Sequence, residues 1–202
     1  MNSSNASALL ALGTALRQAG YRFMTVTPST HRRINNRPGN ERAHDLRGVF
    51  GWSRPFDRDL LPASVVALMA DAGVLEENED GLRSLVRAST LDDMLLFHSA
   101  WPTRDDDSVF FGPDTYRFIT AMRRGFAFVG AGPVRAVDIG CGGGAGALAI
   151  ARAFPHAEVI GADINTRALE LAMVNGSLNG VSNLALAQSD LFDGLQGDFD
   201  LV

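Results

Sequence analysis

The feature that most constrains this chain is the run VDIGCGGGAG, Val137–Gly146, in which an apolar segment passes directly into a cluster of glycines. The apolar residues 134–139 predict a strand. The residues after the glycines have apolar spacings of three and four, which predicts a helix with one buried face: Ala147, Ile150, Ala151 and Phe154. Glycine is needed where a strand turns sharply into a helix and where a ligand approaches the backbone closely. A purely structural turn also uses glycine, so the neighbouring residues decide between the two interpretations.

The alternation of strand and helix continues to the end of the sequence. Residues 158–164 predict a second strand, and Asn165 is a suitable N-cap for a helix whose inward positions are Ala168, Leu171, Ala172 and Leu178. Residues 184–188 predict a third strand, and 199–202 the start of a fourth. Such alternation gives a parallel sheet with right-handed crossovers, and ligands bind outside the carboxyl ends of its strands. The expected fold of this part is therefore α/β, with a Rossmann-like parallel sheet.

An acidic residue precedes the glycine cluster. Asp138 lies two residues before Gly140. A carboxylate at this point repels the pyrophosphate of a dinucleotide but attracts a cationic ligand. Asp138 therefore favours S-adenosylmethionine, which has a sulfonium and an amino group, over NAD(P). Alternatively Asp138 caps amides of the loop, and both roles are compatible.

Two further acidic residues follow the next two predicted strands. Asp163 lies 19 residues beyond Gly144 and is placed to accept hydrogen bonds from two ribose hydroxyls. The alternative for Asp163 is an exposed loop acid or a helix cap. Ile164 is expected against the adenine face. Asp190 follows the third strand and is expected to accept from the adenine amino group, with a solvated turn acid as the alternative.

The segments VDIGCGGGAG, ADIN and SDLF resemble the first three cofactor motifs of class I S-adenosylmethionine-dependent methyltransferases, and the resemblance covers about 110–202. It implies that the turn 140–144 holds the methionine part of the cofactor, that Asp163 binds the ribose and that Asp190 lies near the adenine. The expected cofactor-binding residues are Asp138, Gly140, Cys141, Gly142, Gly144, Asp163, Ile164, Asp190, Leu191 and Thr115.

Thr115 comes from a second resemblance. The segment VFFGPDTYRFITAM, Val109–Met122, resembles the segment before the first strand in the release-factor glutamine methyltransferases, with matches at Pro113, Asp114 and Thr115. The resemblance implies that Thr115 lies beside the cofactor. The residues alone predict a helix N-terminus with Asp114 or Thr115 as the cap. The wider likeness is to the small-domain methyltransferases of protein amides and nucleic-acid exocyclic amines.

Members of that group end the fourth strand with Asn or Asp, two prolines and an aromatic residue, which hold the substrate nitrogen. Here the sequence ends at Val202, so the catalytic residues are expected just after it and none is assigned within the chain. The chain is expected to hold the cofactor-binding half of the enzyme and to be inactive alone. The resemblance implies in-line methyl transfer to nitrogen of a protein glutamine or a nucleic-acid base, without a metal. The alternatives are an inactive cofactor- or partner-binding module and, less favoured, an NAD(P)-dependent oxidoreductase.

The N-terminal part, 1–108, predicts a small α+β domain, followed by the cofactor-binding domain 109–202. Helices are expected over 9–19 and 60–75, a loop over 27–47, and strands over 82–88 and 94–99. A helix followed by two strands is the pattern of a winged helix. The acidic stretch 104–108 is the expected linker.

Composition limits the partners. The chain has 18 basic and 23 acidic residues, a net charge of -5, which argues against broad binding of phosphates. A local basic cluster either contacts RNA or is a solvated loop: His31, Arg32, Arg33, Arg37, Arg42 and Arg47. The expected partner is a protein or RNA methyl acceptor. One cysteine and the lack of a long apolar run predict a cytoplasmic protein without a membrane span, and the four scattered histidines predict no metal site.

Overall fold

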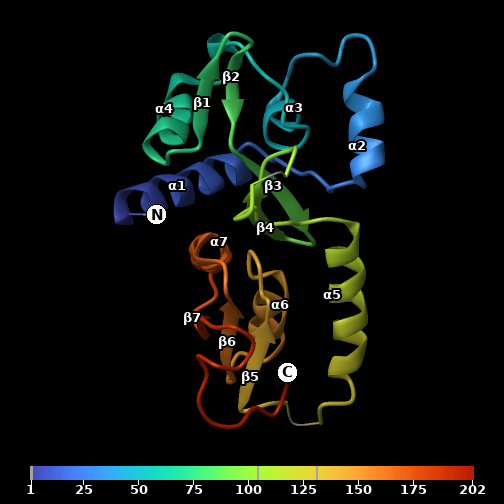
Figure 1. Ribbon diagram of the computed structural model, residues 1–202, viewed down its shortest axis with the longest axis vertical. Coiled ribbons are helices and arrows are strands. Elements are labelled where there is room, and N and C mark those ends of the chain that lie inside the picture. The colour runs from blue at the N-terminus through green and yellow to red at the C-terminus, as the bar shows by residue number, and fades with distance from the viewer. Residues whose placement is uncertain (1, 104, 131) are drawn as a thin grey trace. The chain divides into compact units, whose positions relative to one another are not determined.

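The computed structural model describes residues 2–103, 105–130 and 132–202. The chain divides into two compact units, whose elements are labelled in Figure 1. The first unit comprises Met1–Arg104 and Phe111–Pro113, and the second comprises Asp105–Phe110 and Asp114–Val202. Arg104, part of the predicted linker, lies outside the described residues, and the acidic residues that follow it belong to the second unit.

The second unit contains a parallel sheet with the order β5-β6-β7, formed by Arg135–Ile139, Glu158–Asp163 and Leu184–Gln188. Helices α6 (Ala145–Ala153) and α7 (Thr166–Leu178) connect successive strands, and α5 (Pro113–Phe126) precedes the first strand. The predicted α/β fold is thereby confirmed. Small residues allow α6 to pack closely on the sheet, in a core of Ala136, Ala147, Ile150, Ala151, Ala157 and Val159. Figure 1 shows α6 and α7 beside the three strands.

The last residues of the chain pair with β5 on the side opposite β6. The N–H of Val137 donates to the carbonyl of Leu201 at 2.9 Å, and Ala136 and Leu201 form an isolated parallel bridge. The carboxylate of Asp200 accepts from the N–H groups of Val134 and Arg135 at 2.8 and 2.9 Å. The predicted fourth strand is therefore present only as this single bridge.

The first unit combines helices with two antiparallel hairpins. Its helices are α1 (Ser3–Gln18), α2 (Pro28–Asn35), α3 (Leu46–Phe50), the short 3-10 helix η1 (Arg58–Leu60) and α4 (Ala63–Asp71). One hairpin pairs β1 (Leu75–Asn78) with β2 (Gly81–Ser84), and the other pairs β3 (Val86–Leu91) with β4 (Met94–Ser99). α1 contributes three fully buried leucines to the core: Leu9, Leu12 and Leu16.

Three local predictions for this unit were wrong. The predicted loop contains α2, because the Thr27 side chain accepts from the N–H of Thr30 and Pro28 occupies the first turn, where proline is favoured. α4 is shorter than predicted, because Gly73 with φ +68° follows its end and a strand begins at Leu75. The strand predicted over 82–88 is two strands, interrupted after Ser84.

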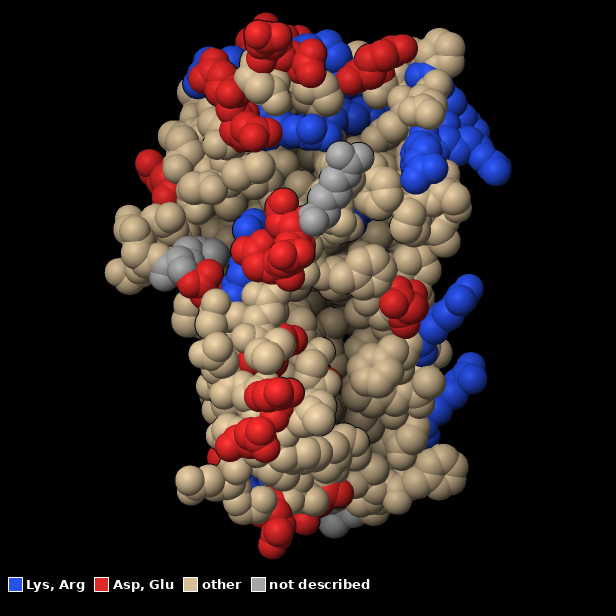
Figure 2. All heavy atoms as spheres, viewed as in Figure 1, with Lys and Arg blue, Asp and Glu red and all other residues tan. Residues whose placement is uncertain are grey.

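The basic cluster is also smaller than predicted. His31 is buried and its Nε2 lies 3.0 Å from the carbonyl of Trp52. Burial, with a further contribution from Arg87, lowers the pKa of His31 to about 4, so it is neutral at pH 7. Arg42 forms an ion pair with Asp57. The exposed remainder is centred on α2, where Figure 2 shows arginine side chains gathered.

No helix among the described residues is both long and apolar enough to span a bilayer.

Candidate functional site

Backbone hydrogen bonds hold the carboxyl ends of β5, β6 and β7 at one edge of the sheet. The N–H groups of Gly140 and Cys141 donate to the carbonyl of Ala162 at 2.8 and 3.0 Å. The N–H of Ser189 donates to the carbonyl of Asp163 at 3.1 Å. The glycine turn after β5 is thus joined to the end of β6, which is joined in turn to the residues after β7.

The glycine turn is open where a ligand would approach. Gly140, Gly142 and Gly144 have φ of 70°, 54° and 84°, values that other residues rarely adopt. A Cβ on Gly140 or Gly142 would meet nothing within 4 Å, whereas one on Gly144 would lie 3.1 Å from Ala172. The first two glycines therefore leave free space beside the backbone, and the third allows the turn to pack against α7.

Cys141 faces inward from the same turn. Its side chain is buried, and burial raises the pKa of the thiol, with the nearby carboxylates of Asp138 and Asp163 adding to the shift. A thiol in this state is a poor nucleophile. Cys141 therefore shapes the turn through packing and its backbone.

Asp138 caps the first turn of α6. Its Oδ2 accepts from the N–H of Ala147 at 2.7 Å, as the capping alternative predicts. A Cβ on Gly146 would lie 2.5 Å from this oxygen, which explains the last glycine of the run. Burial raises the pKa of Asp138 to about 6, and the nearby negative charge of Asp163 adds to the shift.

Asp163 connects the ends of the first two strands. Its Oδ2 accepts from the N–H of Gly142 at 2.8 Å, and its Oδ1 accepts from the N–H of Asn165 at 2.9 Å. Asn165 itself is the N-cap of α7, as predicted, because its side chain accepts from the N–H of Arg167 at 3.0 Å. Each carboxylate oxygen has more than one acceptor position, so Asp163 retains capacity for further donors.

Apolar side chains are exposed beside these acids. Ile164, Leu191 and Phe192 are 64%, 66% and 50% exposed. The hydroxyl of Ser189 shapes the turn after β7 by accepting from the N–H of Gly194 at 2.9 Å and donating to the carbonyl of Leu191 at 2.8 Å. Asp190 is exposed in this turn. Exposed apolar side chains beside carboxylate acceptors can pack against the face of a flat ring while the acceptors bind hydrogen-bond donors on the edge of that ring.

The prediction that Asp114 or Thr115 occupies the cap of α5 was wrong. The helix begins at Pro113, so Asp114 and Thr115 lie in its first turn. Pro113 begins this helix for the same reason as in many others: its ring fixes φ, and a first-turn residue needs no N–H bond. Thr115 is half-buried.

Sequence reasoning missed two residues that support the site. Asn175 on α7 is fully buried, and its Nδ2 donates to the carbonyl of Gly143 at 2.8 Å, so it holds the middle of the glycine turn. Asp107 packs on the start of α7, where its carbonyl accepts from Asn165 Nδ2 at 2.9 Å and its carboxylate pairs with Arg167 at 3.2 Å. A polar residue on the predicted inward face of α7 was the available signal for Asn175.

The cluster offers hydrogen-bond acceptors and open glycine backbone at one edge of a sheet. Within the described ranges, no group of three or more His, Cys, Asp or Glu side chains is placed to hold a metal ion.

Residues 133–202 match the family described as a methyltransferase domain. The chain is 45% identical over 69 residues to the release factor glutamine methyltransferase of Rhodopirellula baltica, a match that covers 33% of this chain and 23% of that protein. It is 26% identical over 156 residues to the ribosomal protein uL3 glutamine methyltransferase of Neisseria gonorrhoeae, covering 70% of this chain and 50% of that protein. The matches thus span about a quarter to a half of these relatives.

Among solved structures, a transferase from Pyrococcus horikoshii is similar over 62% of this chain and 47% of that chain, with a TM-score of 0.39 and 16% sequence identity.

Proposed function

We propose that this chain, whose residues 133–202 form a methyltransferase-domain segment of the class I type, binds S-adenosylmethionine and belongs to an enzyme that methylates the side-chain amide of a protein glutamine. The observation that carries the proposal is the joining of three strand ends at one edge. There the open glycine turn, Asp163 and the turn containing Asp190 follow successive parallel strands.

The residues at this edge fit the parts of the cofactor. The space beside Gly140 and Gly142 admits the methionine portion against the backbone. The free acceptor capacity of Asp163 suits the two ribose hydroxyls, and the exposed side chains of Ile164 and Leu191 offer apolar contact to the adenine. Asp190, which is exposed in the turn after β7, is proposed to accept from the adenine amino group, and Thr115 is proposed as a further contact.

Asp138 distinguishes this cofactor from a dinucleotide. Its carboxylate lies at the base of the glycine turn, next to Gly146, where a pyrophosphate is repelled and a sulfonium or ammonium group is attracted. Its bond from the N–H of Ala147 uses one oxygen, so capping does not prevent this electrostatic role. Cys141 and Gly144 contribute the shape of the turn.

When bound, the cofactor supplies an electrophilic methyl group, and transfer requires a nitrogen positioned in line with it. The contribution of the described residues is to bind and orient the donor. The acceptor is proposed from the relatives, two of which are named as glutamine methyltransferases of a release factor and of ribosomal protein uL3.

Isothermal titration of residues 1–202 with S-adenosylmethionine, S-adenosylhomocysteine and NAD tests the proposal. Both adenosyl ligands are expected to bind with at least tenfold higher affinity than NAD. Preferential binding of NAD would instead support an oxidoreductase. Incubation of the complete enzyme to which this chain is proposed to belong with labelled S-adenosylmethionine and a glutamine-containing release-factor or uL3 segment, followed by mass spectrometry, tests the acceptor. Methylation of another residue type would contradict the glutamine assignment.

A further inference from the structure

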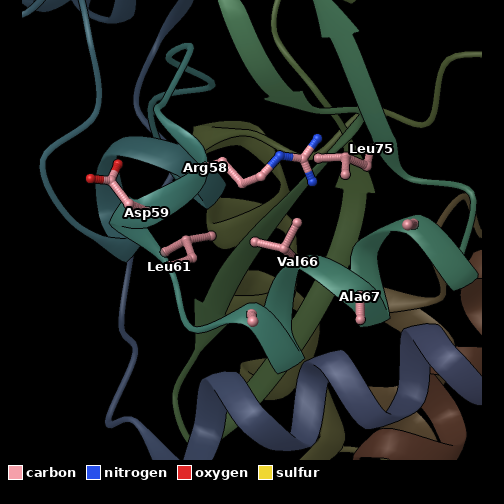
Figure 3. A pocket seen from close by; sticks show the side chains of 8 residues that line it. Arg58, Asp59, Leu61, Val66, Ala67 and Leu75 are labelled. Carbon is pink, nitrogen blue, oxygen red and sulfur yellow. The ribbon is translucent and has the colours of Figure 1, made fainter.

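A groove lies on the solvent side of α4 in the first unit, separate from the residues of the proposed cofactor site. Its volume is about 460 Å³, within the range of about 300–1,000 Å³ that ligand sites occupy. The lining comes from η1, α4 and the start of β1, as Figure 3 shows: Arg58, Asp59, Leu61, Ala63, Val66, Ala67, Ala70 and Leu75. Apart from Arg58 and Asp59, these side chains are apolar.

The floor of the groove is made of small and branched apolar side chains. Ala63, Ala67 and Ala70 are exposed, although the exposed side of a surface helix ordinarily carries charged or polar residues. Leu61 and Val66 are buried beneath them. Small side chains let an incoming chain approach α4 closely, and the branched ones offer apolar surface to cover.

Acidic residues belong to the lining of the groove or lie close to it along the chain, and we call them its rim: Asp57, Asp59, Asp71, Glu76, Glu77, Glu79 and Asp80. Residues 57–80 contain seven acidic residues and one arginine, so this segment has a net charge of -6. Figure 2 shows acidic side chains gathered over the β1–β2 hairpin. The only cation in this segment, Arg58, pairs with Glu77 at 3.0 Å. Among the described residues, no ion pair is recorded for Asp59, Asp71 or Glu79, so the rim carries uncompensated negative charge.

We propose that this groove docks an extended basic segment of another protein, with an aliphatic side chain over Leu61 and Val66 and arginine or lysine side chains at Asp59 and Asp71. The apolar floor gives affinity through burial of the aliphatic side chain, and the acidic rim selects its cationic neighbours. Nucleic acid is disfavoured because its phosphates are repelled by the same rim. A second copy of the chain is disfavoured by its own net charge of -5.

Arg58 opposes this partner in the unbound groove. In Figure 3 its side chain extends across the groove toward Leu75, and its guanidinium holds Glu77. A cationic segment that enters the groove competes with Arg58 for that carboxylate. Removing the charge of Arg58 is therefore expected to strengthen binding, which is the opposite of the usual effect of removing a residue from a binding site.

Fluorescence anisotropy with the 202-residue chain tests the proposal. The probe is a fluorescein-labelled peptide, Gly-Ser-Arg-Arg-Leu-Arg-Arg-Ser-Gly, and two matched peptides replace its arginines with glutamate or its leucine with serine. The basic leucine peptide is expected to bind at least tenfold more tightly than either control, and added salt is expected to weaken it. Failure of the basic peptide to bind, or equal binding of the glutamate peptide, would overturn the proposal.

Substitutions in and beside the groove test whether the peptide binds there. Ala67→Arg fills the floor and adds a like charge, so at least a tenfold loss of affinity is expected. Ser64→Arg makes the same addition on the same helix outside the lining, and less than a threefold change is expected. Arg58→Gln is expected to tighten binding about threefold, and Asp59→Asn with Asp71→Asn to weaken it without changing the floor.

Two results would contradict the placement. Peptide affinity that survives both Ala67→Arg and the Asp59→Asn, Asp71→Asn pair would locate the peptide elsewhere. Self-association in sedimentation that Ala67→Arg abolishes, without binding of the peptide, would make the groove a contact between copies of the chain. Circular dichroism establishes that each variant is folded, and the asparagine pair tests the rim if Ala67→Arg does not fold.

Discussion

The backbone N–H of Gly142 donates a 2.8 Å hydrogen bond to the carboxylate of Asp163, which joins the glycine turn after β5 to the end of β6. The other oxygen of the same carboxylate accepts from the N–H of Asn165 at the start of α7. Asp163 therefore fixes two loops relative to each other, and we propose that its remaining acceptor capacity serves the ribose hydroxyls.

Replacing Asp163 with alanine is expected to weaken S-adenosylmethionine binding by about tenfold to a hundredfold. Hydrogen bonds to a charged acceptor contribute about 1.5–3 kcal/mol each, and the change also releases Gly142. Isothermal titration measures the effect. Asp198→Ala is the control, because it removes an exposed acid with the same change in net charge. Equal affinities for the two variants would show that Asp163 does not contact the cofactor.

Alanine at Gly142 is expected to disturb both the turn and the ligand. The residue has φ +54°, so a side chain adds strain of about 1 kcal/mol, and the new methyl group occupies the open space beside the turn. Gly180→Ala is a matched control with φ +66° and similar open space. Thermal denaturation should show similar destabilisation in both variants, whereas titration should show loss of cofactor affinity in Gly142→Ala alone. Parallel losses of affinity would argue against a site at the turn.

Asp138 is expected to give opposite pH dependences for stability and for binding. Burial raises its pKa from 3.8 to about 6, so the folded chain binds the proton more strongly than the unfolded chain. This stabilising contribution is present below about pH 4 and is lost as pH rises through about 6. The proposed electrostatic role of Asp138 toward the cationic cofactor requires the carboxylate, so affinity is expected to rise over the same pH window.

Asp138→Asn tests both pH dependences. It should remove the step near pH 6 from both curves, stabilise the unliganded chain at pH 7 by about 1–3 kcal/mol and weaken cofactor binding. Urea denaturation and titration from pH 4.5 to about 8 measure these effects. A step near pH 6 that persists in the asparagine variant would assign the titration to another group.

His31 is expected to destabilise the first unit in acid. Burial lowers its pKa from 6.5 to about 4, so the unfolded chain binds the proton more readily. Its contribution to stability is present above pH 6.5 and is lost as pH falls toward about 4. Both tryptophans of the chain, Trp52 and Trp101, lie against it with ring centroids at 5.3 and 4.9 Å, so intrinsic fluorescence reports the change. His31→Phe should reduce the pH dependence of unfolding, and an unchanged profile would exclude His31 as its source.

The local signals in the sequence were sufficient for the strands and the glycine turn of the second unit. Apolar runs predicted all three strands. The glycine cluster predicted the turn, because a positive φ at Gly140, Gly142 and Gly144 favours glycine over other residue types. Asn165 was recognisable as a cap because capping depends on neighbouring residues only. The roles of Asp163 and Asp190 toward the cofactor stay predictions that the titrations address.

Non-local contacts explain what the sequence did not reveal. The burial of His31 between Trp52 and Trp101 depends on segments far apart in the chain, so it was grouped with the arginines around it. α2 is a different case, because its signals are local: 27–47 was predicted as a loop, although Thr27 caps the helix and proline in the first turn favours one. Asn175 was missed because only the folded chain shows that its amide reaches Gly143.

The pairing of Leu201 with β5 has a consequence for how the site arises. β5 pairs with β6 on one side and with Leu201 on the other. The connections that lead to these two neighbours therefore run to opposite sides of β5. Where strand order reverses in this way, the loops at the carboxyl edge diverge and open a crevice at the topological switch point. The open space beside Gly142 thus lies at a position that strand order sets, and substitutions of the residues around it are expected to change which ligand binds there while the position itself persists.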